Sequence, residues 1–110
     1  MIYTKDNPKL VENIFYFESI NAFTGVVKDK DNDIAYYLNG KLHRTDGPAV
    51  EHANGDKYWL LNGKYHREDG PAVEYHDGDK EWWLNDKSYG YDDDFTNESW
   101  IRFVKLQLLK

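Results

Sequence analysis

The chain has 110 residues, the size of a single domain, and its 20 acidic and 14 basic side chains leave a net charge of −6. Its 4 Trp, 9 Tyr and 5 Phe predict a folded chain, because disordered segments are poor in aromatic residues. The mean hydropathy of −0.87 excludes a transmembrane helix, and the lack of cysteine excludes disulfides, thiol nucleophiles and cysteine-ligated zinc. The acidic balance argues against a direct grip on nucleic-acid phosphates, which requires a basic surface.

Residues 1–23 are expected to form an N-terminal cap for the rest of the domain. Asn7-Pro8 is typical of the start of a short helix, and residues 14–17 have the composition of a strand that pairs with residues 24–29. The first residues lack the charged and then apolar pattern of a secretory signal, so we expect a cytoplasmic location and no membrane contact.

An internal repeat with a period of 23 residues organises residues 24–90. Residues 58–74 repeat residues 35–51, and residues 81–87 carry a third, partial copy. Each copy predicts a hairpin of two short strands, and Asn54-Gly55 is expected to join one such pair as a two-residue type I′ turn. The fold class predicted is all-β, with a single-sheet antiparallel β-meander of about six or seven strands.

Alternation along the predicted strands assigns their side chains to two faces. The repeating core is expected to consist of nine aligned positions: Val27, Tyr36, Leu38, Val50, Trp59, Leu61, Val73, Trp82 and Leu84. The opposite face carries Tyr37, Tyr58 and Trp83, and this second apolar surface needs either cover from the terminal segments or a partner.

Residues 91–110 change to a helical pattern and complete the single domain of residues 1–110. The sequence predicts a helix over 97–109 that docks on the sheet or closes its edge, with Thr96 or Asn97 as its N-cap. Three acidic residues that favour the positive end of the helix dipole precede it: Asp92, Asp93 and Asp94.

Two stretches carry a resemblance to a known repeat family, with equivalents one repeat earlier: Trp59-Leu60-Leu61-Asn62-Gly63-Lys64-Tyr65-His66 and Tyr75-His76-Asp77-Gly78. Over residues 24–87 the chain resembles MORN-type repeats, in the variant found in bacteriophage and bacterial proteins. It departs from the usual pattern by having His-Arg-x-Asp-Gly-Pro-Ala in place of His-Gly-x-Gly. The resemblance implies an elongated β-meander that serves as a scaffold or binding surface and is not an enzyme.

Two repeated pairs, His43-Arg44 and His66-Arg67, are expected to stack as a ladder along one edge of the sheet. One hypothesis is that these side chains hold an anion or a nucleotide. The other is that each arginine braces its own loop by pairing with the aspartate two residues further on. Recurrence in every unit favours the second hypothesis. No metal site, catalytic residue or cofactor is predicted, because no set of residues has the required spacing.

The preferred function is a non-enzymatic protein-binding module, a small phage or bacterial accessory factor that inhibits a host defence component. Its location would be the host cytoplasm if it is phage-encoded. The candidate partner-binding residues are those of the second apolar face and of the acidic run: Tyr37, Tyr58, Trp83, Asp92, Asp93 and Asp94. One alternative is a protein that sequesters a nucleotide signal on the His/Arg ladder, and another is an enzyme with a loop histidine as base. Edge strands of an open meander are also compatible with a homodimer.

Overall fold

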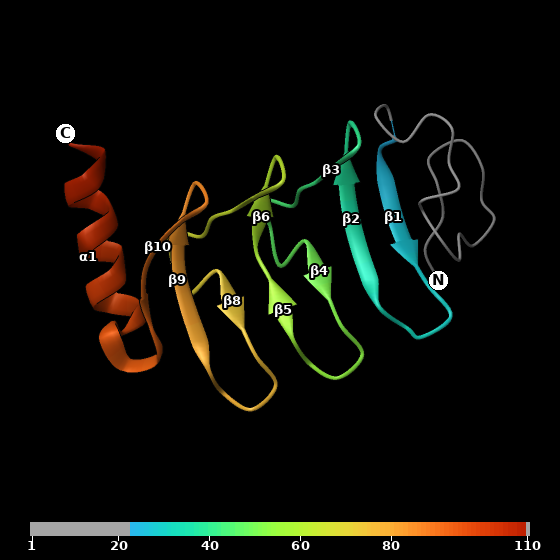
Figure 1. Ribbon diagram of the computed structural model, residues 1–110. Helices are drawn as coiled ribbons and strands as arrows, with labels where there is room; N and C mark the ends of the chain where they lie inside the picture. The colour runs from blue at the N-terminus through green and yellow to red at the C-terminus, as the bar shows by residue number, and fades with distance from the viewer. Residues whose placement is uncertain (1–22, 110) are drawn as a thin grey trace.

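The computed structural model describes residues 23–109, in which short strands follow one another along an elongated sheet that ends in a helix (Figure 1). The N-terminal helix and strand expected at Asn7-Pro8 and 14–17 lie outside the described residues. The strands are β1 (Gly25–Lys28), β2 (Ile34–Leu38), β3 (Lys41–Leu42), β4 (Val50–Glu51), β5 (Lys57–Tyr58), β6 (Leu60–Leu61), β7 (Lys64–Tyr65), β8 (Val73–Glu74), β9 (Lys80–Leu84) and β10 (Lys87–Tyr91). They are followed by the 3₁₀ turn η3 (Asp92–Asp94) and the helix α1 (Asn97–Leu108).

Eight strands form one antiparallel sheet in the order β1-β2-β4-β5-β8-β9-β10, with β3 paired to β2. Strands β6 and β7 form a second, two-stranded sheet, and β6 follows β5 after the single residue Trp59. The predicted antiparallel meander with a C-terminal helix is therefore confirmed. The strands are more numerous than expected because each repeat is interrupted by a loop, at 43–49 and 66–72.

The turn at Asn54-Gly55 differs from the two-residue turn that the sequence predicts. His52 N–H donates to the Asp56 carbonyl at 2.9 Å, so three residues lie between the paired positions. Gly55 has a φ of 103°, the left-handed conformation that closes a three-residue hairpin loop. Paired positive φ values, as type I′ requires, occur instead at Asn39-Gly40 and Asn62-Gly63.

This difference in turn length reverses the face to which the valine column belongs. A two-residue turn would place Val50 opposite Trp59, whereas the three-residue turn places it opposite Tyr58. Val73 likewise lies opposite Glu81, and a slip of one residue moves every side chain to the other face. The assignment of the three valines to the tryptophan face is therefore wrong.

Loops 43–49 and 66–72 fold over the face of Tyr36, Trp59 and Trp82, which we call the loop face. The Arg44 guanidinium lies 4.0 Å above the Tyr36 ring, and that of Arg67 lies 3.8 Å above Trp59. At Trp82 the same role falls to Trp100 of α1, with a distance of 5.4 Å between ring centroids. The two tryptophans are 1% and 0% exposed and form the centre of the core.

The helix α1 begins where the sequence predicts and docks on the end of the sheet. Thr96 is its N-cap, because the Thr96 hydroxyl accepts a hydrogen bond from Ser99 N–H at 3.0 Å. Trp100 and Val104 are its buried residues, and the Trp100 indole N–H donates to the Arg67 carbonyl at 2.8 Å. The helix thus closes the series of repeats on the loop face.

Hydrogen bonds between successive repeats hold the two edges of the sheet. On one edge His43 Nδ1 accepts from Asn62 N–H at 2.9 Å, and the equivalent His66 Nδ1 accepts from Asn85 N–H. On the other edge Asp56 Oδ1 accepts from His76 N–H at 2.8 Å. Because each unit is bonded to the next at both edges, the position of one repeat fixes the position of its neighbour.

Replacing Arg67 with alanine is expected to lower the free energy of unfolding by about 2–4 kcal/mol, because it removes a stacked cation and several charge-assisted hydrogen bonds. Chemical denaturation of the full chain measures this change. Arg102→Ala on the exposed side of α1 is the control and should cost less than about 0.5 kcal/mol. Equal costs for the two variants would show that Arg67 does not brace its loop.

Candidate interaction surface

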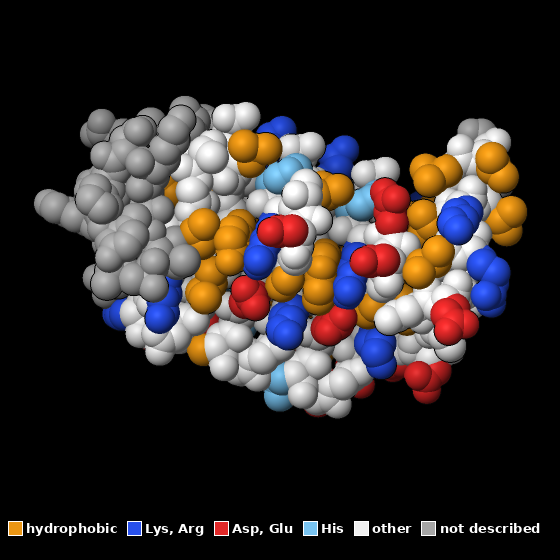
Figure 2. Space-filling model, turned by 180° about the vertical axis from the view of Figure 1, so that it is seen from behind, with side chains coloured by type: hydrophobic (Ala, Val, Ile, Leu, Met, Phe, Trp, Pro, Cys, Tyr) orange, Lys and Arg blue, Asp and Glu red, His pale blue; other side chains and the backbone are white. Residues whose placement is uncertain are grey.

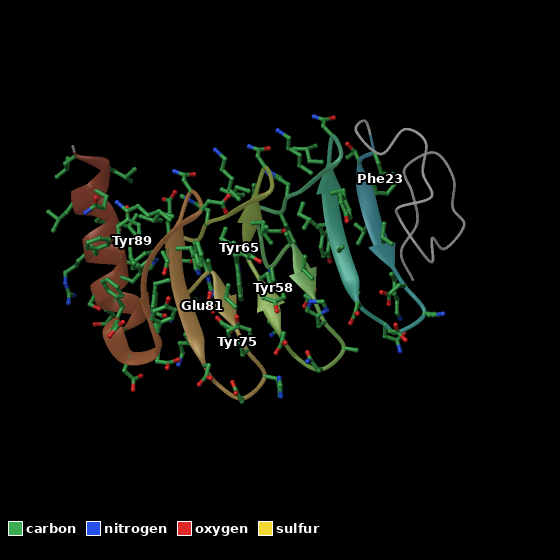
Figure 3. The ribbon with its side chains drawn as sticks, in the orientation of Figure 1. Phe23, Tyr58, Tyr65, Tyr75, Glu81 and Tyr89 are labelled. Carbon is green, nitrogen blue, oxygen red and sulfur yellow. The ribbon has the colours of Figure 1, made fainter. Side chains whose placement is uncertain are left out.

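The face opposite the loops carries a cluster of aromatic side chains, which we call the tyrosine face. Its members come from neighbouring repeats and lie together over the middle of the sheet: Tyr58, Tyr65, Tyr75, Glu81 and Trp83 (Figure 3). The Tyr58 ring centroid lies 6.2 Å from that of Tyr65 and 6.3 Å from that of Tyr75, and Tyr65 lies 5.2 Å from Trp83. All five side chains are half-buried.

Loops 43–49 and 66–72 and the helix α1 all pack on the loop face (Figure 1). No element among residues 23–109 therefore covers the tyrosine face. A half-buried group of tyrosines with a tryptophan has the composition of a protein-binding hot spot.

Glu81 lies at the centre of this cluster and accepts hydrogen bonds from two of its members. The Tyr75 hydroxyl donates to Glu81 Oε2 at 2.8 Å, and the Trp83 indole N–H donates to Oε1 at 2.9 Å. A carboxylate has about four acceptor positions, so these two bonds occupy one position on each oxygen. The bonds fix both rings around a negative charge.

The same contacts raise the pKa values of the tyrosines. The hydrogen bond to Glu81 raises the pKa of Tyr75 far above its ordinary value, since a phenolate could not donate this bond. Burial raises the pKa values of Tyr58 and Tyr65 as well. The tyrosines of this face are therefore neutral hydrogen-bond donors at physiological pH.

The predicted partner-binding residues are brought together only in part. Tyr58 and Trp83 belong to the cluster, joined through Tyr65. Tyr37 lies on the same face but in the first repeat, where its ring contacts Phe23 at 5.7 Å.

The acidic run is engaged in structure at the end of the sheet. Asp92 Oδ1 accepts from Lys80 N–H, and Asp94 Oδ2 accepts from Tyr91 N–H. Asp93 lies between them and is exposed. These bonds hold η3 against β9 and β10.

Sequence reasoning missed Tyr65, Tyr75 and the role of Glu81. Tyr65 and Tyr75 lie on the short strand next to each loop, outside the columns that the alignment of second strands reveals. The register provides the missing signal, because it places Tyr65 directly opposite Leu60 and therefore on the face of Tyr58.

Charge is distributed unequally between the two faces. The lysines of the strands all point to the loop face, as their pairing shows: Lys28, Lys41, Lys57, Lys64, Lys80 and Lys87. On the tyrosine face Glu81 is the charged residue of the cluster. Next to Tyr58, a hollow of about 380 Å³ is lined by Asp31, Asp33 and Asp56. The tyrosine face is thus aromatic and acidic.

The His/Arg ladder lines a pocket of about 620 Å³ on the loop face, where blue and red side chains alternate over the apolar surface (Figure 2). Arg44, His66 and Arg67 converge there, and the pocket also contains three carboxylates. Both arginines are engaged, since Arg44 Nε donates to Asp46 at 2.8 Å and Arg67 Nε donates to Asp69 at 2.9 Å.

The two loop histidines are engaged in structural bonds as well. His43 Nδ1 and His66 Nδ1 each accept a backbone hydrogen bond from the next repeat, and His66 Nε2 lies 2.9 Å from Glu68. These geometries match the bracing hypothesis for the ladder.

Among residues 23–109 no group of three or more His, Asp or Glu side chains is placed to hold a metal ion. Within the same residues, no helix has the length and apolar character needed to cross a membrane. Comparisons of the chain with protein-family models, curated proteins and solved structures found no match. The candidate site is therefore argued from the geometry of this chain alone.

Replacing Glu81 with glutamine should lower the pKa of Tyr75 toward the ordinary tyrosine value of about 10, because the amide is a weaker acceptor than the carboxylate. An NMR titration of the chain with labelled tyrosine measures this change. Tyr37, in another repeat, should titrate identically in both proteins. If Tyr75 ionises at the same pH in the wild type and the variant, the Tyr75–Glu81 bond does not exist in solution.

Proposed function

We propose that the protein is a non-enzymatic binding module that recognises another protein through the tyrosine face. The observation that carries this proposal is the cluster of Tyr58, Tyr65, Tyr75 and Trp83, which no element among residues 23–109 covers. Aromatic side chains of this kind bury a large area at a small cost in conformational entropy, which is why they concentrate in protein interfaces.

Departures from the repeat support this choice of face. The residues of the loop face recur, since His43, Arg44 and Glu51 have identical equivalents 23 residues later. On the tyrosine face the equivalent positions differ between repeats, with Ala35, Tyr58 and Glu81 in one column. Identical residues at every unit serve the architecture, whereas the tyrosine face has a different composition in each unit, as specific recognition of one partner requires.

The anion-binding alternative has weaker support. The arginines of the ladder are stacked on rings and paired with Asp46, Asp69, Glu51 and Glu74, so an incoming anion would have to break these pairs. The pocket that they line contains more carboxylates than guanidinium groups. Its potential is therefore unfavourable for a nucleotide phosphate.

The MORN-type resemblance suggests the setting in which such a module works. We extend the proposal to a small phage or bacterial accessory factor that acts in the cytoplasm and inhibits a host defence component by occupying its surface. An aromatic face on a rigid sheet suits this role, because a pre-formed surface binds without a cost of ordering.

The double variant Tyr58→Ala/Tyr65→Ala should reduce capture of partner proteins more than tenfold, since loss of two hot-spot residues exceeds 2 kcal/mol. The matched control is Lys57→Ala/Lys64→Ala, which changes the adjacent residues on the loop face and should leave capture unchanged. Quantitative mass spectrometry of proteins retained by each tagged chain from host lysate makes the comparison.

Thermal unfolding of both double variants verifies that they remain folded at the capture temperature. Partners whose recovery falls equally in the two variants, or in neither, would contradict binding through the tyrosine face.

A further inference from the structure

We propose that the partner of the tyrosine face presents arginine, and that its guanidinium binds Glu81 between the surrounding rings. The inference rests on the proposed function and adds to it the chemistry of the partner. It follows from the charge of this face, from the geometry of Glu81 and from the rings beside it.

The charge of the tyrosine face is complementary to a cationic partner. The strand lysines all lie on the loop face, so none of them offsets Glu81 across the sheet surface. Asp33 and Asp56 line the hollow beside Tyr58 and extend the negative potential along the same face. Such a potential attracts cationic side chains and repels an acidic surface.

Glu81 is held in the orientation that a guanidinium needs. Tyr75 and Trp83 each donate to a different oxygen of the carboxylate, at 2.8 and 2.9 Å, and so fix its plane without neutralising its charge. One acceptor position on each oxygen is left for a pair of parallel N–H donors. Arginine supplies such a pair in a planar fork, which lysine cannot do.

The rings on either side supply a second attraction. Tyr58, Tyr65 and Trp83 lie beside Glu81 on the same face, and guanidinium groups stack favourably on tyrosine and tryptophan rings. The molecule already uses this arrangement within its own fold, where Arg67 lies 3.8 Å above Trp59 and pairs with Glu74 at 2.7 Å. The tyrosine face contains the same elements, a ring and a carboxylate, without an arginine of its own among the described residues.

A titration of the full chain with a short peptide tests the inference. The probe is acetyl-Leu-Arg-Leu-Arg-Leu-amide, and its comparison peptides have citrulline or lysine in place of both arginines. Two-dimensional NMR at low salt follows the indole N–H signals of the tryptophans. The arginine peptide should shift Trp83 and leave Trp82 and Trp100, which are buried on the loop face, unchanged.

We expect the citrulline peptide to bind at least about tenfold more weakly and the lysine peptide to lie between the two, because the charge-assisted pair is lost or reduced. Glu81→Gln should weaken binding of the arginine peptide by about the same factor. Glu98→Gln, which removes the same charge from the first turn of α1, should leave binding unchanged within twofold.

Three results would overturn the inference. Equal binding of the arginine and citrulline peptides at Trp83 would remove the guanidinium while leaving the tyrosine face as a protein-binding surface. Equal losses in Glu81→Gln and Glu98→Gln would reduce the effect to net charge. No shift of Trp83 with any peptide would contradict arginine recognition directly, whereas the proposed function is decided separately by the paired alanine variants.

Discussion

The stacking of an arginine from each loop onto an aromatic residue of the sheet is the contact on which the rest of the structure depends. Arg67 covers Trp59, pairs with Asp69 and Glu74, and donates to the Pro71 carbonyl, so one side chain holds the loop, the strand and the ring together. Small two-residue strands such as β7 and β8 have little stability alone. The loops therefore supply the core that a single sheet of this size lacks on one face.

This contact also gives the two faces different functions. The loops and α1 occupy the loop face, and the lysines and recurring carboxylates of the strands are on that side. The tyrosine face has no such cover within the described residues, and its composition departs from the repeat at Glu81 and Trp83. A repeat protein can vary such a face without disturbing its fold, because the residues that hold the units together lie elsewhere.

The sequence was sufficient to predict the elements of the fold that depend on local pattern. The 23-residue period, the antiparallel meander, the helix with its Thr96 cap and the bracing of each loop by arginine and aspartate are all present. The face of the valines was predicted wrongly, because Asn-Gly is compatible with turns of different length and the register depends on that length by a single residue.

The candidate site depends on the same register and was predicted only in part. Tyr58 and Trp83 follow from alternation along the second strands, but Tyr65 and Tyr75 join them only after pairing across strands is known. The bonds from Tyr75 and Trp83 to Glu81 are tertiary contacts of unique residues, which a repeat pattern cannot indicate.

Photochemically induced nuclear polarisation of the free, full-length chain tests most directly whether the tyrosine face is available to a partner. This NMR experiment enhances the signals of tyrosines and tryptophans that a dye can reach from solution. The account predicts enhancement of Tyr58, Tyr65 and Trp83, with Trp82 and Trp100 silent because they are 1% and 0% exposed. Silence of all three residues of the tyrosine face would mean that the chain or a second copy already covers it, and would contradict the account.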